Sequence, residues 1–543
     1  MSLHTPYKYL SLLLAAVLLL VGCGAPDSTP NLPPKATPSP THFQVDEPTA
    51  TPAAISAWRS PALPPELAES AEALQELNGQ RIEWVDRAEA AELRFEPAAQ
   101  QPLSVWVYAA AVPFATVTDG LSLEDLSSSF SGTGPRPMVA EHSTLQAWAS
   151  RWGQPGVEAQ LPEQWFDSAA KEDVEAVALL EFDQLGRQWK VLRVEDQSPF
   201  DPDFNASSYP LTVTFGVSGP SELQQAAAQA VDWPPTNRDD QQLTSLAITG
   251  VTALTRATAW AIQRQGVDWA VESVAPVLSS ADITHISHEV SFTPACPPVN
   301  PSRDVMRFCA QPEQIEVLAA IGTDVVELTG NHVMDYGSEA LLTTLDLYQQ
   351  QEWAVFGGGR NLMEAEEPAI LEHNGHRFAF LGCNSAGPNF AWATSEQPGA
   401  RPCDFEVFYQ QIRDLKDKGY LPVVTFQWAE SYRDWPLPQQ AEAFRQAAAA
   451  GAVIVSGSQA HRPQGFEFTD QGFIHFGLGN LFFDQMWSLE TRQEFIDLYH
   501  FYQGELISIE LTTWMLDDYA RVRPMTEEER AGFLEAMFET SGY

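Results

Sequence analysis

Positive charge is scarce in this sequence of 543 residues. There are 30 Lys and Arg residues against 72 Asp and Glu residues, which gives a formal net charge of -42 at pH 7. The acidic residues are spread along the chain rather than gathered in one block, so they indicate solubility and repulsion of anionic partners. Nucleic acid and anionic lipid are therefore not expected as ligands.

Cysteine is also scarce, with 5 residues in the whole chain. No CxxC spacing occurs, which disfavours the competing interpretation of a zinc site. Apart from Cys23, four cysteines remain, and they allow three pairings. We favour Cys296 with Cys309 and Cys383 with Cys403, because each pair closes a short segment that contains Pro or Gly. Disulfides of this kind indicate an oxidising or non-reducing compartment.

Long apolar runs are absent except near the N-terminus, where LSLLLAAVLLLV follows Lys8. This run is too short for a stable membrane span and has the length of a signal-peptide core. It ends in Leu20-Val21-Gly22-Cys23, which resembles a bacterial lipobox. Residues 1–23 are therefore predicted to be a lipoprotein signal peptide with Cys23 as the lipidation site, so that the protein is extracytoplasmic and anchored to the cell membrane.

Residues 24–57 are rich in Pro and Thr and are predicted to form an extended tether. Residues 58–240 mix short strands such as LSVWVYAAAVPF with helical stretches such as STLQAWASRW, which predicts an accessory α/β domain. Its segment VPFATVTDGLSLEDLSSSFSGTGP resembles part of the type 2 periplasmic solute-binding domains. It carries no ligand-specific motif, so a purely structural domain is the competing interpretation.

The segment ELTGNHVMDYG, residues 327–337, places Asn331 and His332 side by side after a predicted buried strand. An amide that ligates metal beside an imidazole that moves protons suits a metal-assisted hydrolase. The following helix is expected to present Leu341, Leu342, Leu345 and Leu347 on one face. A second strand-to-loop segment, AVIVSGSQAHRPQGFEF at 452–468, ends near His461.

Three other segments surround these motifs. LTSLAITGVTAL, beginning at Leu243, is predicted to be an apolar strand that ends in a turn at Gly250. The run at 357–360, Gly-Gly-Gly-Arg, lacks the Lys-Ser/Thr of a P-loop and is better interpreted as a tight turn. Asn374-Gly375 predicts a hairpin.

These motifs, in this order from about 243 to 486, resemble the CapA family of capsule and poly-γ-glutamate synthesis proteins. The resemblance implies that residues 241–543 form a four-layer α/β/β/α sandwich of the calcineurin-like metallophosphatase fold, after the smaller α/β domain. It implies metal ligation by Glu289, Asn331 and His461 and a proton-donor role for His332. Gln427 and Gln459 take positions where the family has histidine, and Val251 stands where the family has a ligating aspartate.

Two functions remain open from the sequence. The first is a metal-dependent hydrolase or transferase, with His332 as the catalytic acid and one divalent ion, Mn, Mg, Ca or Zn, held by Glu289, Asn331, His461 and glutamine oxygens. The second is a non-catalytic binding or assembly factor with a degenerate metal site. In both cases the expected partner is a cell-envelope polymer or its synthesis machinery.

Overall fold

A computed structural model describes residues 53–162, 164, 176–302 and 305–543. The predicted signal peptide, Cys23 and most of the predicted tether lie outside the described residues. Ala53–Tyr543 form one compact unit, and its first strand, β1 (Ile55–Arg59), begins inside the stretch that the sequence assigned to the tether. Within the described ranges, no helix has both the length and the apolar character needed to cross a membrane.

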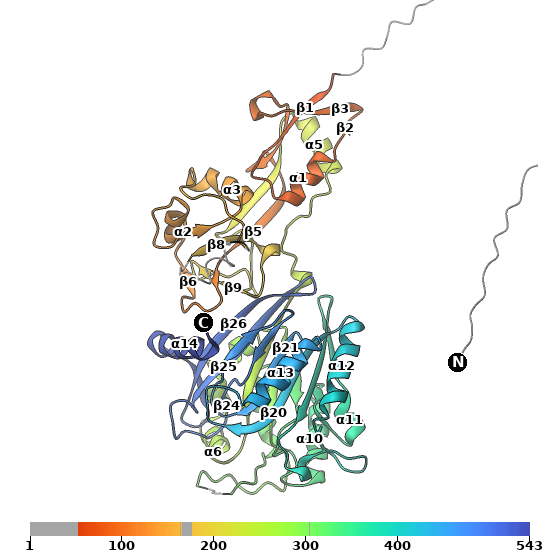
Figure 1. The fold of residues 1–543 in the computed structure, drawn as a ribbon, viewed down its shortest axis with the longest axis vertical. Helices are drawn as coiled ribbons and strands as arrows, with labels where there is room; N and C mark the ends of the chain where they lie inside the picture. The colour runs from red at the N-terminus through yellow and green to blue at the C-terminus, as the bar shows by residue number, and fades with distance from the viewer. Residues whose placement is uncertain (1–52, 163, 165–175, 303–304) are drawn as a thin grey trace, which may run out of the picture. The chain divides into compact units, whose positions relative to one another are not determined.

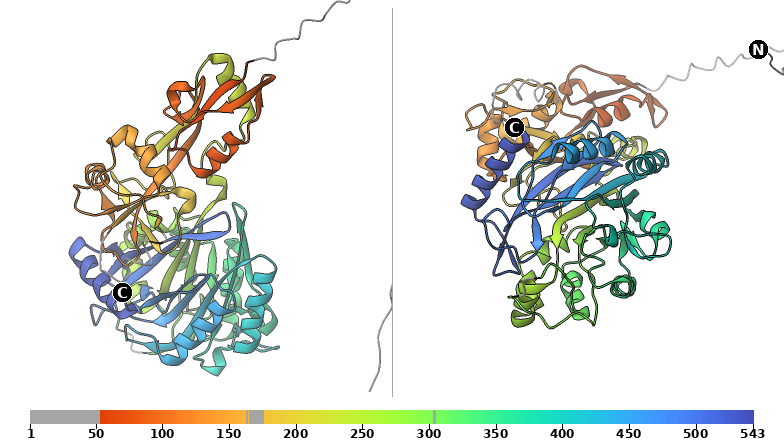
Figure 2. Two further views of the ribbon diagram at one scale, coloured as in Figure 1. Left: turned by 45° about the horizontal axis from the view of Figure 1, so that its top comes forward. Right: turned by 60° about the horizontal axis from the view of Figure 1, so that its bottom comes forward.

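Residues 53–240 build a sheet in the strand order β2-β3-β1-β4-β11-β5-β8-β7, with β9 paired to β5. Helices α1, α3 and α5 pack with it, and Figures 1 and 2 show this part from red to yellow. Its strands are β2 (Glu76–Leu77), β3 (Gln80–Trp84), β4 (Leu93–Pro97), β5 (Gln101–Pro113), β7 (Met138–Val139), β8 (Val177–Glu181), β9 (Trp189–Val191) and β11 (Thr212–Ser218). A separate pair joins β6 (Gly120–Leu121) and β10 (Arg193–Val194). The helices are α1 (Pro65–Glu72), α2 (Leu123–Phe130), α3 (His142–Trp152) and α5 (Ser221–Ala230).

Residues 241–543 build two large sheets. One has the order β15-β14-β13-β12-β25-β26-β27, with β24 beside β12, and the other has the order β17-β18-β20-β21-β23-β22. The first contains β12 (Leu243–Thr252), β13 (Ile283–His288), β14 (Val325–Glu327), β15 (Ala354–Phe356), β24 (Asn480–Phe482), β25 (Gln493–Tyr502), β26 (Glu505–Asp517) and β27 (Arg521–Pro524). The second contains β17 (Ala369–His373), β18 (His376–Asn384), β20 (Leu421–Ser431), β21 (Ile454–Ala460), β22 (Phe466–Phe468) and β23 (Phe473–His475).

Helices cover the outer faces of these two sheets. The first sheet is covered by α6 (Arg256–Gln265), α7 (Val267–Val271), α8 (Ala275–Leu278), α9 (Ile315–Ala320) and α10 (Ser338–Gln350), whose buried residues share one core with the strands. The second sheet is covered by α12 (Phe405–Asp417) and α13 (Pro438–Ala449), as Figure 1 shows beside β20. The last helix, α14 (Glu527–Ser541), joins the core between the sheets, and α11 (Leu362–Glu366) lies outside both.

Three cores therefore separate four layers. Ile248 and Phe380, from different sheets, lie in the core between the sheets, whereas Ala247 and Leu381 belong to the two helix-facing cores. This alternation follows from the two-residue period of a strand that is buried on both faces. The predicted α/β/β/α sandwich, preceded by a smaller α/β part, is the observed fold.

The prediction for β12 was wrong at its end. The strand does not turn at Gly250 but continues to Thr252, and it lies in the middle of its sheet between β13 and β25. Gly250 is needed for close approach, because a Cβ at this position would lie 2.3 Å from the carbonyl oxygen of Gly479. A glycine inside a strand marks such an approach as often as a turn.

The helix after Gly337 forms as predicted, but its buried face differs in detail. Leu341 and Leu345 are buried together with Thr344 and Tyr348, whereas Leu342 and Leu347 are half-buried. The 3.6-residue period places 341, 344, 345 and 348 on one side. The predicted hairpin forms at Asn374-Gly375, where both residues have positive φ, and the Gly-rich run forms the short strand β16 (Gly358–Gly359), which pairs with β19 (Gly399–Ala400).

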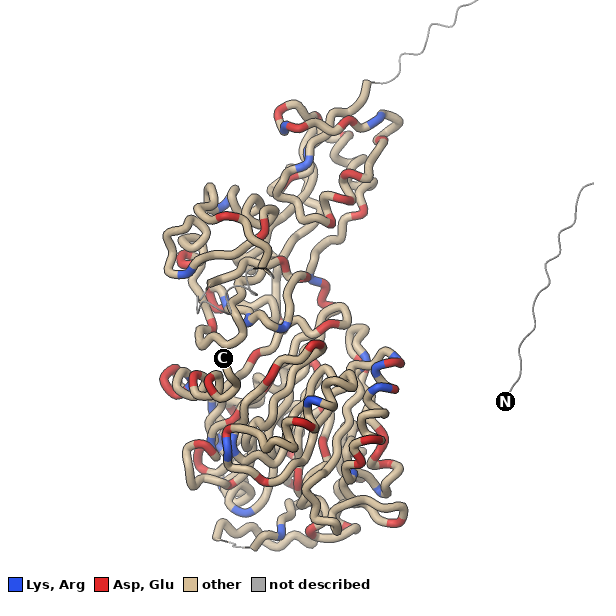
Figure 3. The backbone as a smooth tube through the Cα atoms, in the orientation of Figure 1, with Lys and Arg blue, Asp and Glu red and all other residues tan. Residues whose placement is uncertain are grey.

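Both favoured disulfides, Cys296–Cys309 and Cys383–Cys403, are present. Figure 3 shows the positions of acidic residues dispersed along the described chain, with fewer basic residues between them. The absence of a single acidic block in the described residues agrees with the distribution in the sequence.

Candidate functional site

The predicted site residues lie where parallel strands end. Strands β12, β13 and β14 are parallel neighbours in one sheet, and β18, β20 and β21 are parallel neighbours in the other. Glu289 follows β13, Asn331 and His332 follow β14, Gln427 lies in the last half of β20, and His461 follows β21. Because the carboxyl ends of parallel strands meet at one edge, residues that are distant in the sequence share one place.

Glu289 and the Asn331-His332 pair are held together by their backbones. Val290 forms a bridge with His332, and Gly330 packs so closely that a Cβ there would lie 2.5 Å from the Cα of Glu289. Glu289 is buried, and neither of its carboxylate oxygens has a hydrogen-bond partner. Burial raises the pKa of Glu289 to about 7. A buried carboxylate without partners is costly for folding alone, which marks this position as a candidate for function.

His332 is oriented by Asp335. The Nδ1 atom of His332 lies 2.7 Å from Asp335 Oδ2, which also accepts a hydrogen bond from the backbone N–H of Phe308 at 2.7 Å. Burial opposes protonation of the imidazole, but the hydrogen bond to Asp335 and the charge of Glu289 raise the pKa of His332 above its ordinary value. A protonated imidazole beside a second carboxyl group is equipped for proton transfer.

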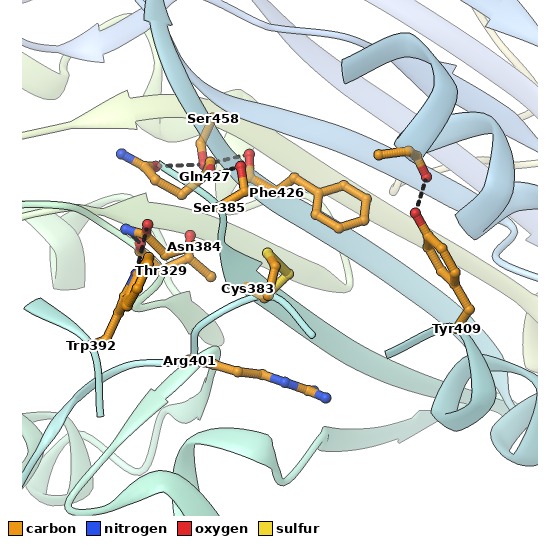
Figure 4. The surroundings of a disulfide bond; sticks show 12 residues. Thr329, Cys383, Asn384, Ser385, Trp392, Arg401, Tyr409, Phe426, Gln427 and Ser458 are labelled. Carbon is orange, nitrogen blue, oxygen red and sulfur yellow. Dashed lines mark hydrogen bonds between the residues drawn. A yellow bond between two sulfur atoms is a disulfide. The ribbon is translucent and has the colours of Figure 1, made fainter. Parts of the chain in front are cut away.

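The two glutamines at family histidine positions are joined to each other. Gln427 Nε2 donates to Gln459 Oε1 and, at 3.1 Å, to Asn331 Oδ1. Ser458 Oγ lies 2.9 Å from Gln427 Oε1 and 2.9 Å from Glu327 Oε1. Figure 4 shows Gln427 beside Ser458. Gln459 Oε1 therefore accepts from Gln427, whereas Gln427 Oε1 and Glu327 Oε1 compete for the single hydroxyl proton of Ser458.

The hydrogen-bonded network of Gln427, Ser458 and Glu327 extends to further buried residues. Glu327 also accepts from Thr329 Oγ1, and His285 Nε2 lies 3.4 Å from Glu327 Oε2. Burial disfavours the charged form of Glu327, but the nearby imidazole of His285 and the hydroxyl groups of Thr329 and Ser458 lower its pKa below the ordinary value. Asn384, next to the disulfide-bonded Cys383, donates to the backbone oxygen of Thr329 at 2.8 Å (Figure 4). The loop that carries Asn331 is therefore anchored from both sheets.

His461 is buried as a neutral imidazole. Its Nδ1 atom lies 2.8 Å from Asn480 Oδ1, and burial lowers the pKa of His461 to about 4. Nδ1 therefore donates to Asn480, which leaves the lone pair on Nε2. Gln459, two residues earlier, has a φ of 76°, a conformation that non-glycine residues adopt mainly in turns and functional sites.

The donor set does not fit a dinuclear metal centre. Val251 is buried and apolar, and the two glutamine side chains are engaged with each other. Of the other predicted ligands, Glu289 has oxygens without hydrogen-bond partners, and the imidazole of His461 is oriented by Asn480, as metal-ligating histidines are. Within the described residues, no group of three or more His, Cys, Asp and Glu side chains is placed to hold a metal.

Several residues around this site are brought to it only by the fold. Ser458 and Glu327 lie 131 positions apart in the sequence and meet only through sheet pairing. Arg256 packs its guanidinium 4.4 Å from the Phe308 ring centroid, and Phe308 in turn lies 4.2 Å from the His332 ring. Asn480, which orients His461, is the first residue of β24. His288, at an apolar position of the family pattern, is buried against Tyr348, and burial lowers its pKa to about 3.

The four layers and the polar residues at the strand ends define a metallophosphatase-like sandwich. Residues 245–485 match the family model described as bacterial capsule synthesis protein PGA_cap. Over these residues the chain is similar to the capsule synthesis family, which agrees with the CapA resemblance that its motifs predicted.

Two similar proteins are named for capsule or poly-γ-glutamate biosynthesis. The chain is 29% identical over 273 residues to the capsule biosynthesis protein CapA of Bacillus anthracis, a match that covers 49% of this chain and 66% of that protein. It is 32% identical over 190 residues to the PGA biosynthesis protein CapA of Bacillus subtilis strain 168, which covers 35% of this chain and 50% of that protein. The matches thus span about two thirds and half of these relatives' own lengths.

Among solved structures, a 5'-nucleotidase precursor from Thermus thermophilus is 12% identical, with a TM-score of 0.32, over 55% of this chain and 58% of that protein. A hypothetical protein from the same organism is 11% identical, with a TM-score of 0.33, over 50% of this chain and all of that protein. Similarities at these scores carry no argument about function.

Proposed function

We propose that this chain acts in the synthesis or handling of an extracytoplasmic capsule or envelope polymer of the poly-γ-glutamate type, held at the cell membrane by a lipid on Cys23. The family match over 245–485 and the two named relatives support this proposal. The observation that carries it is the unpaired, buried carboxylate of Glu289 packed against Asn331 and His332.

The side chains at this site suggest a chemical role for each residue. Asp335 holds a proton on Nδ1 of His332 and orients the ring, so that Nε2 can donate a proton to a leaving group. Glu289, Asn331 and His461 would hold one divalent ion, Mn, Mg, Ca or Zn. When bound, such an ion supplies Lewis-acid polarisation and activates water. Glu289, with a pKa near 7, would be ionised in part at neutral pH even without the ion.

The first test measures the divalent metal content of the purified chain by inductively coupled plasma mass spectrometry, without chelator or added metal. One equivalent is expected, and it should be lost in His461→Ala but kept in His142→Ala, which changes an exposed histidine outside the site. Two equivalents in the wild type would contradict the single-ion site.

The second test incubates poly-γ-glutamate with the chain and measures newly released amines. His332→Asn should lower turnover by about 100-fold or more, the usual contribution of a general acid. Turnover that is unchanged in this variant would remove His332 from the catalytic role.

The second candidate is a non-catalytic polymer-binding or assembly factor. Val251 and the Gln427–Gln459 pair favour it, because three family ligand positions carry groups that bind cations weakly or not at all. Under this candidate His332→Ala would change the melting temperature and leave polymer length unchanged, whereas polymer binding would persist without added metal.

A further inference from the structure

A small pocket with an accessible volume of about 20 Å³ lies beside the site and is not explained by metal ligation. Its lining includes Thr255, Arg256, Val299, Asn300, Arg307 and the Cys296–Cys309 disulfide. Two guanidinium groups in one pocket are notable in a chain with a net charge of -42, because most charged side chains here would repel an anion.

Arg256 is fixed in this pocket at some cost to the backbone. It begins α6 with a φ of 45°, a conformation that a non-glycine residue rarely adopts. Its guanidinium forms two hydrogen bonds with Asp484, one of them 3.0 Å from Nε to Oδ2, and lies over the Phe308 ring. Arg256 is therefore pre-oriented, although Asp484 offsets its charge.

Arg307 has the more exposed guanidinium of the two. Its Nε donates to the backbone oxygen of Asp335 at 2.6 Å, and its guanidinium lies 4.3 Å from the Tyr336 ring centroid. The residue is exposed, and it has no acidic ion-pair partner among the residues that the structure describes. The terminal amino groups of this guanidinium are thus available to a planar anion.

The pocket is connected to His332 through adjacent contacts. Arg307 and Phe308 are consecutive, and both bind Asp335, the residue that orients His332. The Cys296–Cys309 disulfide closes the loop that carries them. An anion bound between Arg256 and Arg307 would therefore be separated from His332, the proposed proton donor, by Asp335 on one side and Phe308 on the other.

Four other arginines near the motif segments are less suitable for anion binding. Arg360 pairs with Asp346 and Glu364, and Arg462 pairs with Asp434. Arg433 and Arg264 lie over the tryptophans Trp435 and Trp260 instead. None of these four lines the pocket.

We propose that the pocket of Arg256 and Arg307 is a carboxylate subsite, which binds one free carboxylate of an acidic polymer while a neighbouring linkage lies at His332. This inference rests on the proposed function and adds to it the group by which the polymer is recognised. A guanidinium fork matches a carboxylate with two parallel hydrogen bonds, and a γ-linked glutamate chain carries one carboxylate on every residue.

The test is isothermal titration calorimetry of the full chain with a γ-linked glutamate pentamer at low salt. Arg307→Met removes the exposed guanidinium, and Val299→Trp fills the pocket from its rim. Each should weaken binding by about 10-fold or more, the loss expected when one charge-assisted hydrogen-bonded pair is removed. Arg264→Met is the matched control, because it removes an exposed arginine on α6 that does not line the pocket, and it should bind as the wild type does.

The outcomes separate the two proposals. If the wild type and Arg307→Met bind the pentamer equally, the carboxylate subsite is wrong and the proposed function stands. If the wild type binds no pentamer, the polymer-handling function fails and the subsite fails with it. Inorganic phosphate is titrated in parallel, and binding of phosphate alone, abolished by Arg307→Met, would make the pocket a site for a free inorganic anion and overturn the carboxylate assignment.

Discussion

Asp335 accepts hydrogen bonds from three different residues around the site. Its side chain accepts from His332 and from the backbone of Phe308, and its backbone oxygen accepts from Arg307. A single carboxylate therefore links the proposed proton donor to the loop that carries the arginine pocket. It also keeps the pKa of His332 raised although the ring is largely buried.

We predict that Asp335→Asn lowers the pKa of His332. The amide keeps the shape of the side chain but removes its negative charge, so that burial of the imidazole is no longer opposed as strongly. Two-dimensional NMR of the imidazole nitrogens across a pH titration measures this change. Asp346→Asn, which removes an exposed carboxylate on α10, should leave the His332 titration where it was.

The same raised pKa has a consequence for stability. A folded-state pKa above the unfolded value of about 6.5 means that the protonated ring stabilises the fold fully below that pH. This contribution is lost as the pH rises through the folded pKa of His332. Asp335→Asn should therefore destabilise the protein more at about pH 6 than at about pH 9, as measured by urea unfolding, and an equal loss at both values would contradict the account.

At the scale of single residues, the sequence predicted local features better than contacts between residues that are distant in the chain. Both disulfides and the adjacent Asn331 and His332 were predictable, because they depend on local spacing or on a recognisable motif. The bond between Ser458 and Glu327 was not, because it joins residues from different sheets whose register no local pattern specifies. The role of Arg307 was likewise hidden, since it depends on how a disulfide-closed loop returns to Asp335.

The strand ends determine what the site can bind. β12, β20 and β21 end near one another and present Val251, Gln427 and Gln459, which replace an aspartate and two histidines of the family pattern. The backbone at these positions suits the family residues: Gln459 has positive φ, which histidine tolerates better than most residues. At these three positions the departure from the family pattern therefore lies in the side chains, while the backbone at Gln459 admits a histidine.

We predict that the combined substitution Val251→Asp, Gln427→His and Gln459→His creates a two-ion site. Carboxylate and imidazole ligands would replace an apolar group and two weak neutral donors. Metal content should rise by one equivalent relative to the wild type. The single substitution Val251→Asp is the control: it buries a carboxylate without the two histidines, and it should lower stability without adding an equivalent of metal. No gain in the triple variant would show that the strand ends are misplaced for a second ion.

Elements were predicted best where one period dominated. The strand at 325–327 and the helix at 338–350 follow from an apolar run and a 3.6-residue pattern. The end of β12 was wrong because a glycine that permits close approach of Gly479 has the same sequence signature as a glycine in a turn. Only the neighbouring strand distinguishes the two cases.

The two parts of the described chain share a core. Phe114, just after β5, contacts Phe466, Phe468 and Phe473 of the second part, with ring centroids 5.6, 4.8 and 5.5 Å away. Arg187 also donates to the backbone oxygen of Thr469 at 2.9 Å. Apolar contacts of this kind across a boundary couple the unfolding of the parts they join.

We therefore predict that the wild-type chain unfolds in one transition. Phe114→Ala should cost about 3–5 kcal/mol, the usual range for removing a buried Phe side chain, and should separate the unfolding of the two parts. Urea titration followed by both far-UV circular dichroism and Trp fluorescence would show whether the two curves part. Phe390→Ala, which removes a side chain that is 57% exposed, is the control and should leave the midpoint unchanged.

The most direct measurement of the central claim maps where the polymer binds on the whole chain. A γ-linked glutamate oligomer with a photoreactive diazirine would be cross-linked to the full protein, and the modified peptides would be identified by mass spectrometry. We predict cross-links to the segments around Arg307, His332 and His461, suppressed by an excess of unlabelled oligomer. Cross-links confined to residues 53–240, or insensitive to the competitor, would contradict the assignment of polymer handling to this site.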